Sequence, residues 1–222
     1  MFVIPCKYTD KSPIVECVRS IRRHYPDELI VVVDSDSDDK SYFKSLEEYN
    51  VSIEDISNKN FLEGALWHCF ERYQDEEFIY LIQDSMIIKM NFDYVEDRDF
   101  TCIASFPNNC WAENFEGGSA AQKEFCKKSL EKIGYQYLES DVNWHPVFGI
   151  SFFISRTLMS ILKENGMDTY LPSNKMEMEA SERLWGMVLY QEGIDVAEAC
   201  IMNTPIHTKP NPVISKIWMH RL

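Results

Sequence analysis

The stretch FVIPCKYTDKSPIVECVRSIRRHYPDELIVVVDSDSDD, residues 2–39, contains two apolar runs separated by a helical pattern. FVIP (2–5) predicts a short strand, and Ser12-Pro13 supplies an N-cap and first position for a helix that should end near Tyr25-Pro26. ELIVVVDSDSDD (28–39) begins as a β-branched strand and ends in a carboxylate-rich loop. This order predicts a β-α-β unit within a parallel sheet.

The following segments repeat that order. VSIEDI (51–56) predicts a third strand, apolar residues at helical spacing from 61 to 73 predict a helix, and FIYLI (78–82) returns to a strand. In sheets of this kind, ligands bind beyond the carboxyl ends of the strands. Three polar segments fall at that edge, namely Pro5-Cys6-Lys7, Asp34 to Asp39 and Gln83-Asp84-Ser85.

The second half of the chain is less regular, and its expected elements are strands at 100–106, 147–155 and 194–202, helices at 157–165 and 181–192, and a proline-containing tail from 206. The polar segment 108–122 reads as a loop within the domain. No repeat or linker divides the chain, so residues 1–222 are expected to form a single α/β domain.

The charge and cysteine content exclude several classes of protein. The 36 acidic residues outnumber the 22 basic ones, and the net charge of −14 disfavours nucleic acid as a partner. The seven cysteines include no Cys-x-x-Cys pair, which fits reduced thiols in a cytoplasmic protein. No apolar run is long enough to span a bilayer, and the N-terminus does not read as a signal peptide, so a soluble protein is expected.

The order of the motifs resembles that of GT-A glycosyltransferases, especially the large inverting family-2-type nucleotide-sugar transferases. That family begins with a strand, a proline, a helix with a Ser-Ile pair (here Ser20-Ile21) and a second strand ending in Asp-Asp-x-Ser-x-Asp, which here reads DSDSDD from Asp34 to Asp39. The resemblance continues through Gln83-Asp84-Ser85 and SERLWGMVLYQEGIDV (181–196) to the tail, and so covers most of the chain.

The resemblance implies a GT-A fold, a Rossmann-like α/β fold with a mostly parallel central sheet flanked by helices. It also implies a division of the single domain. Residues 1 to about 90 would form the nucleotide-binding half, and about 91–222 the acceptor-binding half.

GT-A enzymes carry an Asp-x-Asp at the strand end that here reads Gln83-Asp84-Ser85, and its carboxylates hold Mn²⁺ or Mg²⁺ against the donor diphosphate. Gln83 and Ser85 replace both acids, so Asp84 is the only carboxylate and a weaker divalent-cation site is expected. The resemblance adds the late His207 as a second metal ligand. In the alternative reading, Asp84 caps the strand end or bonds to a neighbouring backbone amide.

Carboxylates at the second strand end can accept hydrogen bonds from ribose hydroxyls or from a base N–H, and the first strand end should line the same pocket. Lys209 in the tail resembles the basic residue that many GT-A enzymes offer to the diphosphate. The residues assigned to the nucleotide sugar are therefore Pro5, Lys7, Asp34, Asp36, Gln83, Asp84 and Lys209.

The family places an acidic base at the start of a helix beneath the acceptor, and counting back from Gly193 puts it at Glu182. A carboxylate in a first helical turn would be held ionised by the helix dipole. Glu179 is the reserve candidate, and Glu182 as a merely favourable first-turn charge is the alternative. Trp144 and His145 resemble the acceptor-side segment, although a tryptophan at a strand start is more often a core residue.

Together these patterns predict a hexosyl- or deoxyhexosyltransferase that moves a sugar from a UDP-sugar to a glycan or glycoconjugate, with inversion and with help from a divalent cation. Two alternatives remain open at this point. One is a retaining GT-A transferase, which needs no base. The other is a binding relic of the fold, which Gln83 and Ser85 favour.

Overall fold

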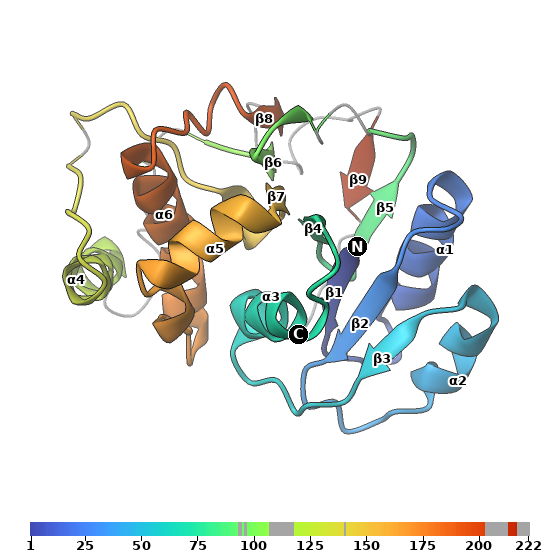
Figure 1. Ribbon diagram of the computed structural model, residues 1–222. Helices are drawn as coiled ribbons and strands as arrows, with labels where there is room; N and C mark the ends of the chain where they lie inside the picture. Colours follow the sequence, from blue (N-terminus) through green and yellow to red (C-terminus); the bar gives the residue numbers. More distant parts are fainter. Residues whose placement is uncertain (93–94, 96, 107–117, 140, 203–212, 217–222) are drawn as a thin grey trace.

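The computed structural model describes residues 1–222 except 93–94, 96, 107–117, 140, 203–212 and 217–222 (Figure 1). The strands are β1 (Phe2–Cys6), β2 (Ile30–Asp34), β3 (Ser52–Glu54), β4 (Phe78–Leu81), β5 (Met86–Ile88), β6 (Phe100–Ala104), β7 (Phe152–Ser155), β8 (Cys200–Met202) and β9 (Ile214–Lys216). The helices are α1 (Ile14–His24), α2 (Tyr42–Leu46), α3 (Phe61–Arg72), α4 (Gly118–Lys132), α5 (Arg156–Glu164) and α6 (Lys175–Gln191), with short 3₁₀ turns η1 (Glu47–Tyr49), η3 (Phe148–Ile150) and η4 (Met167–Thr169).

Within these residues the central sheet has the strand order β3-β2-β1-β4-β7-β6-β8, and β5 and β9 form a separate antiparallel pair. β1 runs parallel to β2 and β4, β2 to β3, and β6 to β8. Only β7 is reversed, since it pairs antiparallel with both β4 and β6. The expected mostly parallel α/β sheet is therefore confirmed.

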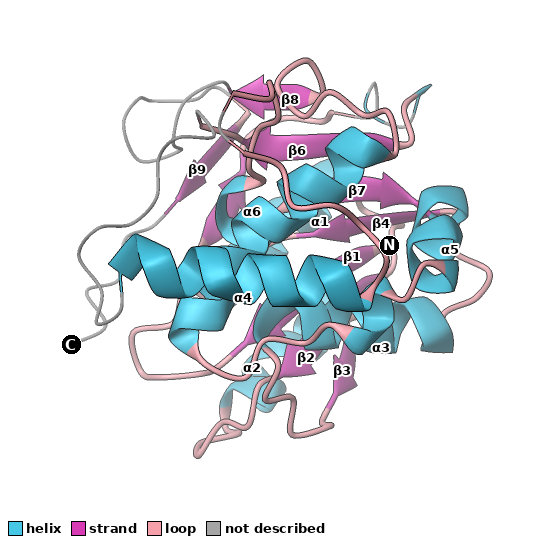
Figure 2. Ribbon diagram, turned by 90° about the vertical axis from the view of Figure 1, so that its left-hand side faces the viewer, coloured by secondary structure: helices cyan, strands magenta, loops and turns pink. Residues whose placement is uncertain are grey.

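Both faces of the sheet are covered, which explains why its first strands are apolar throughout. Phe2 and Ile4 of β1 pack with α1 on one face, whereas Val3 points to the opposite face, where α3, α5 and α6 lie. On that second face α6 packs against β7, with the rings of Phe152 and Trp185 4.9 Å apart. α4 in turn packs against α6 and lies in front of it in Figure 2.

Helix α6 begins at Lys175, six residues before the predicted start at Ser181. The side chain of Asn174 accepts a hydrogen bond from the backbone N–H of Glu177 at 3.0 Å, so Asn174 is the N-cap. The prediction was wrong because it started the helix at the motif rather than at the capping residue. The predicted loop 108–122 was also wrong at its end, since α4 begins at Gly118.

Two predicted strands are shorter than expected. The segment 147–155 is interrupted by η3, where Gly149 has φ +66°, and only β7 remains extended. In 194–202 the side chain of Asp195 accepts from the backbone N–H of Ala197 at 2.9 Å, which favours a turn and delays the strand to β8. Across the described part of the chain, no helix combines the length and apolar character that crossing a membrane requires.

Candidate active site

A cavity of about 930 Å³ opens at the carboxyl ends of β1, β2 and β4. Its strand-end wall contains Pro5 within β1, Lys7 after β1, Asp36 after β2, and Gln83 and Asp84 after β4. These segments meet because β1 pairs in parallel with both neighbours, so the three strands end at one edge of the sheet. The structure thus brings together five of the residues that the sequence assigns to the nucleotide sugar.

Asp34 lies behind this wall rather than on it. Its side chain is fully buried. The carboxylate accepts a hydrogen bond from the hydroxyl of Tyr42 at 2.8 Å and another from the backbone N–H of Ser37 at 3.0 Å. Burial and the Asp34 carboxylate raise the pKa of Tyr42 well above its usual range, so the phenol stays a donor. In this structure Asp34 holds the loop that carries Asp36, which has φ +59°.

The segment between β3 and α3, together with the first residue of α3, forms a further part of the wall that sequence reasoning missed. Asn58, Lys59 and Phe61 line the cavity. The amide of Asn58 donates to the carbonyl of Phe61 at 2.7 Å, and Phe61 has φ +52°. Non-glycine residues with positive φ are uncommon and gather at binding sites, where surrounding contacts hold them. The sequence did contain a signal for this part of the wall, because the segment follows a strand of the parallel sheet as the other lining segments do.

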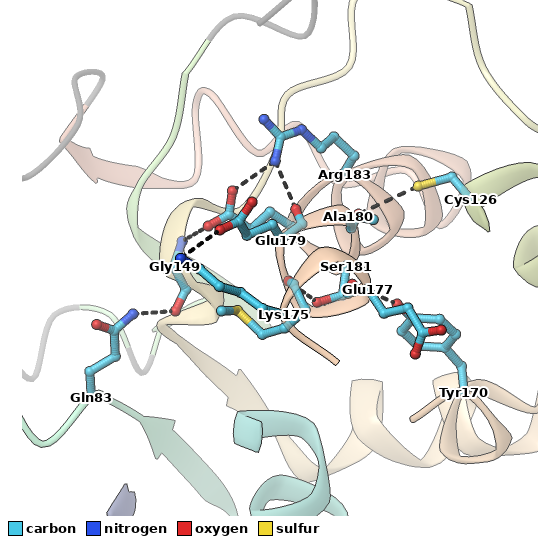
Figure 3. Close-up of polar contacts among 12 residues, drawn as sticks. Gln83, Cys126, Gly149, Tyr170, Lys175, Glu177, Glu179, Ala180, Ser181 and Arg183 are labelled. Atoms are coloured by element: carbon cyan, nitrogen blue, oxygen red, sulfur yellow. Dashed lines mark hydrogen bonds and ion pairs between the residues drawn. The ribbon is translucent and has the colours of Figure 1, made fainter. Parts of the chain in front are cut away.

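The opposite wall is the N-terminal part of α6, joined to the strand ends by a chain of hydrogen bonds. The amide nitrogen of Gln83 donates to the carbonyl of Gly149 at 2.7 Å, and the N–H of Gly149 donates to Oε1 of Glu182 at 2.8 Å (Figure 3). A Cβ on Gly149 would lie 2.6 Å from Nε2 of Gln83, and its φ of +66° also favours glycine. Gln83 therefore connects β4 to α6 through η3.

Glu182 lies two turns inside α6, so the expected stabilisation of its anion in a first helical turn is wrong. Its side chain is 12% exposed, and Oε2 accepts from Nη1 of Arg183 at 3.0 Å. Burial raises the pKa of Glu182 to about 7, although Arg183 and the N–H of Gly149 oppose the shift. A carboxyl that titrates near neutral pH can accept and release a proton under working conditions.

Two further acids lie near Glu182. Glu179, one turn earlier, lines the cavity, and burial raises its pKa. Glu63 in the first turn of α3 is fully buried, and burial raises its pKa to about 7, with a smaller contribution from Glu182. The sequence signal for Glu63 was its spacing from Trp67 and Phe70, which places an acid on a buried helical face.

No family model matches the sequence, and no curated protein matches it. Among solved structures, the chain is similar to GalNAc-T7, a GT-A glycosyltransferase solved with UDP, GalNAc and Mn²⁺, with a TM-score of 0.50. That match has 12% identity and covers 83% of this chain and 40% of GalNAc-T7. The chain has a GT-A fold.

Two structures of S. aureus TarS 1-349 are also similar. The first has 16% identity and a TM-score of 0.45, covering 83% of this chain and 55% of that one. The second, in complex with UDP, has 14% identity and a TM-score of 0.46, covering 81% and 53%. This chain thus spans about half or less of the length of the GT-A structures it matches.

The acceptor-side residues predicted for the GT-A fold do not line the cavity. Trp144 is 1% exposed, and its indole N–H donates to the carbonyl of Glu139 at 3.1 Å, which is a core position. His145 packs against α6 through its backbone, since a Cβ on Gly186 would lie 2.3 Å from the carbonyl oxygen of His145. Trp144 is thus a core residue, and the His145 backbone packs against α6.

The described donors do not by themselves make the metal site expected of a GT-A fold. Asp84 lines the cavity and is 5% exposed, and it is the single carboxylate of the Gln83-Asp84-Ser85 segment. Among the described residues, no three His, Cys, Asp or Glu side chains gather in a way that could hold an ion. His207 and Lys209 lie outside the described residues.

Proposed function

We propose that this GT-A protein is a glycosyltransferase that moves a sugar from a UDP-sugar to a hydroxyl of a glycan or glycoconjugate. One observation carries the proposal. A cavity of about 930 Å³ has polar strand ends on one side and Glu179, a carboxyl whose pKa burial raises, on the other, with Glu182 one turn further along α6. A cavity of this volume matches the size of small-molecule sites. We propose further that the transferred sugar is a hexose or a deoxyhexose.

The proposed chemistry is an inverting displacement. The acceptor oxygen forms a bond to the anomeric carbon while the bond from that carbon to the diphosphate oxygen breaks, and the electron pair leaves with the diphosphate. The acceptor proton passes to Glu182, whose carboxyl titrates in the required range. Glu179 is the reserve base, because it lines the cavity directly.

Donor binding and sugar release together test the function. UDP should raise the unfolding temperature of the protein, since a ligand at 100 times its Kd stabilises by about 2.7 kcal/mol. UMP should stabilise less, because it lacks the second phosphate. A panel of UDP-sugars should then show one that releases UDP slowly alone and faster with a glycan acceptor.

Two results would separate the alternatives. Stabilisation by UDP without any UDP release, at every Mn²⁺ concentration tried, would identify a binding relic of the fold. Absence of stabilisation by any nucleoside diphosphate would contradict the proposed donor site and the transferase function with it.

A further inference from the structure

The cavity has an unusual charge for this protein. Its lining includes four lysines, namely Lys7, Lys59, Lys175 and Lys216. Three carboxylates face them, namely Asp36, Asp84 and Glu179. The chain as a whole carries a net charge of −14, so a cavity with more cations than anions reverses the overall balance. Such a local reversal is what an anionic ligand requires in an acidic protein.

Lys216 differs from the other three lysines in its surroundings. It is half-buried, whereas Lys7, Lys59 and Lys175 are exposed. It ends β9, and the antiparallel pairing of β9 with β5 places it opposite Met86. Met86 follows the Gln83-Asp84-Ser85 segment by one residue, so the Lys216 backbone is held beside that segment. An ammonium group in a half-buried site acts through a lower dielectric than one in water.

Lys216 also reaches the opposite wall of the cavity. Its charge is close enough to Glu182 to lower the pKa of that carboxyl, against the larger effect of burial. Lys216 lines the cavity together with Asp84 at the strand ends and Glu179 of α6, so it borders the region between these two walls. That region is where the diphosphate of a bound donor would have to lie for Glu182 to face the acceptor.

The side chains at the strand end do not favour recruiting a divalent cation. Of the three positions that resemble Asp-x-Asp, only the central one retains a carboxylate, and the flanking side chains of Gln83 and Ser85 carry no negative charge to bind a divalent cation. A diphosphate still needs positive partners, both to bind and to accept the charge released on bond cleavage. Lysine binds phosphate as a point charge and can supply that partner.

We propose that this lysine set, with Lys216 at its centre, neutralises the donor diphosphate in the place of a divalent cation, so that donor binding does not require a metal ion. The inference rests on the proposed function. When the bond between the anomeric carbon and the diphosphate oxygen breaks, the electron pair goes to the diphosphate and the acceptor proton goes to Glu182. Lys216 keeps its protons throughout and stabilises the leaving diphosphate by charge.

Titration calorimetry with UDP and with inorganic pyrophosphate, in EDTA and in MnCl₂, tests the inference. The wild-type protein should bind each probe with nearly the same Kd in both buffers. Lys216→Gln should raise the Kd in EDTA by roughly 10- to 100-fold, as expected for losing a charge-assisted bond. Lys216→Arg keeps the positive charge and should restore most of the affinity.

Lys89→Gln is the matched control. Lys89 follows β5 at the far end of the same β5–β9 pair, is exposed and does not line the cavity. Its replacement removes the same charge from the same small sheet, so the Kd should change less than about twofold, as for a screened surface charge. Thermal unfolding of each variant shows whether the protein remains folded.

Each remaining outcome has one meaning. If EDTA abolished wild-type binding, or if Lys216→Gln bound each probe as the wild type does in the same buffer, the lysine inference would be overturned while the transferase function stood. In the first case Asp84→Asn should lose affinity only in MnCl₂. If neither probe bound the wild-type protein in either buffer, the donor site itself would be absent, and both the inference and the proposed function would fail.

Discussion

The two walls of the cavity are held in different ways. Backbone pairing positions the strand-end wall, because Pro5 belongs to β1 and because Lys7 and Asp36 follow strands that pair in parallel register. Side-chain contacts position the α6 wall, where Glu182 accepts from Gly149 and Arg183 inside the protein. The position of the first wall therefore depends on many backbone hydrogen bonds, which do not require particular side chains. The position of the second wall depends on a few side-chain hydrogen bonds.

In the proposed transferase, this difference would separate donor binding from proton transfer. Lys7 and Asp36 on the strand-end wall are exposed, so their side chains can contact a donor directly. Burial on the α6 wall raises the pKa values of Glu179 and Glu182, which prepares a carboxyl to accept a proton near neutral pH. Substitutions on the two walls should therefore change different kinetic constants.

The largest expected effect comes from replacing Glu182. Glu182→Gln keeps the shape of the side chain but removes the proton acceptor, so kcat should fall by roughly 10²- to 10⁴-fold. Donor affinity should stay within about twofold, because the nucleotide is assigned to the other wall. Wild-type kcat/KM should rise with pH and level off above about 7, where Glu182 is ionised.

The same substitution carries its own check on folding. Because the folded-state pKa of Glu182 lies above the ordinary value of 4.5, the wild-type stability due to this group falls as pH rises from 4.5 to about 7. Glu182→Gln removes that loss of stability, so the variant should remain folded at pH 8.

Near-wild-type transfer by Glu182→Gln, with a large loss in Glu179→Gln, would move the base to Glu179. Near-wild-type transfer by both would favour a retaining enzyme.

The next effect concerns the hydrogen-bond chain between the walls. Gly149→Ala places a Cβ in a left-handed conformation and 2.6 Å from Nε2 of Gln83, so it should destabilise the protein by about 2 kcal/mol. Gly134→Ala is the matched control, since Gly134 has φ +79° but no heavy atom within 4 Å of the added Cβ. It should lose only about 1 kcal/mol. Urea unfolding measures both.

A double variant isolates the contact itself. In a Gln83→Ala background the added Cβ meets no amide, so Gly149→Ala should cost no more than Gly134→Ala does. Equal costs of Gly149→Ala in both backgrounds would show that Gln83 does not restrain Gly149, and that the two walls are not coupled through this chain.

Much of the strand-end wall was predictable because its determinants are local. The β-branched run before Asp34 and the apolar runs before Lys7 and Gln83 each indicate where a buried strand ends. Parallel order then brings the three ends to one edge. The mostly parallel sheet and the lining positions of Lys7 and Asp36 follow from that reasoning alone.

The α6 wall was less predictable because its determinants are distant in sequence. Glu182 could be found by its spacing from Gly193, but its burial depends on Gly149, which lies 33 residues away. Lys216 reaches the cavity only because β9 pairs with β5, and no local pattern in ISK (214–216) indicates that pairing.

The smallest expected effect tests where the α6 wall begins. Asn174→Ala removes the acceptor of the Glu177 N–H bond, and loss of an N-cap costs about 1 kcal/mol of unfolding free energy. Asn174→Asp keeps a capping oxygen and should lose much less stability.

The first turns of α6 carry Lys175 and Glu179, which line the cavity, so fraying of these turns should weaken donor binding slightly. Glu182 lies deeper in the helix, so kcat should stay within about twofold. Unchanged stability in Asn174→Ala would instead mean that α6 is anchored from Ser181 onward and that residues 175–180 are not needed to hold the base.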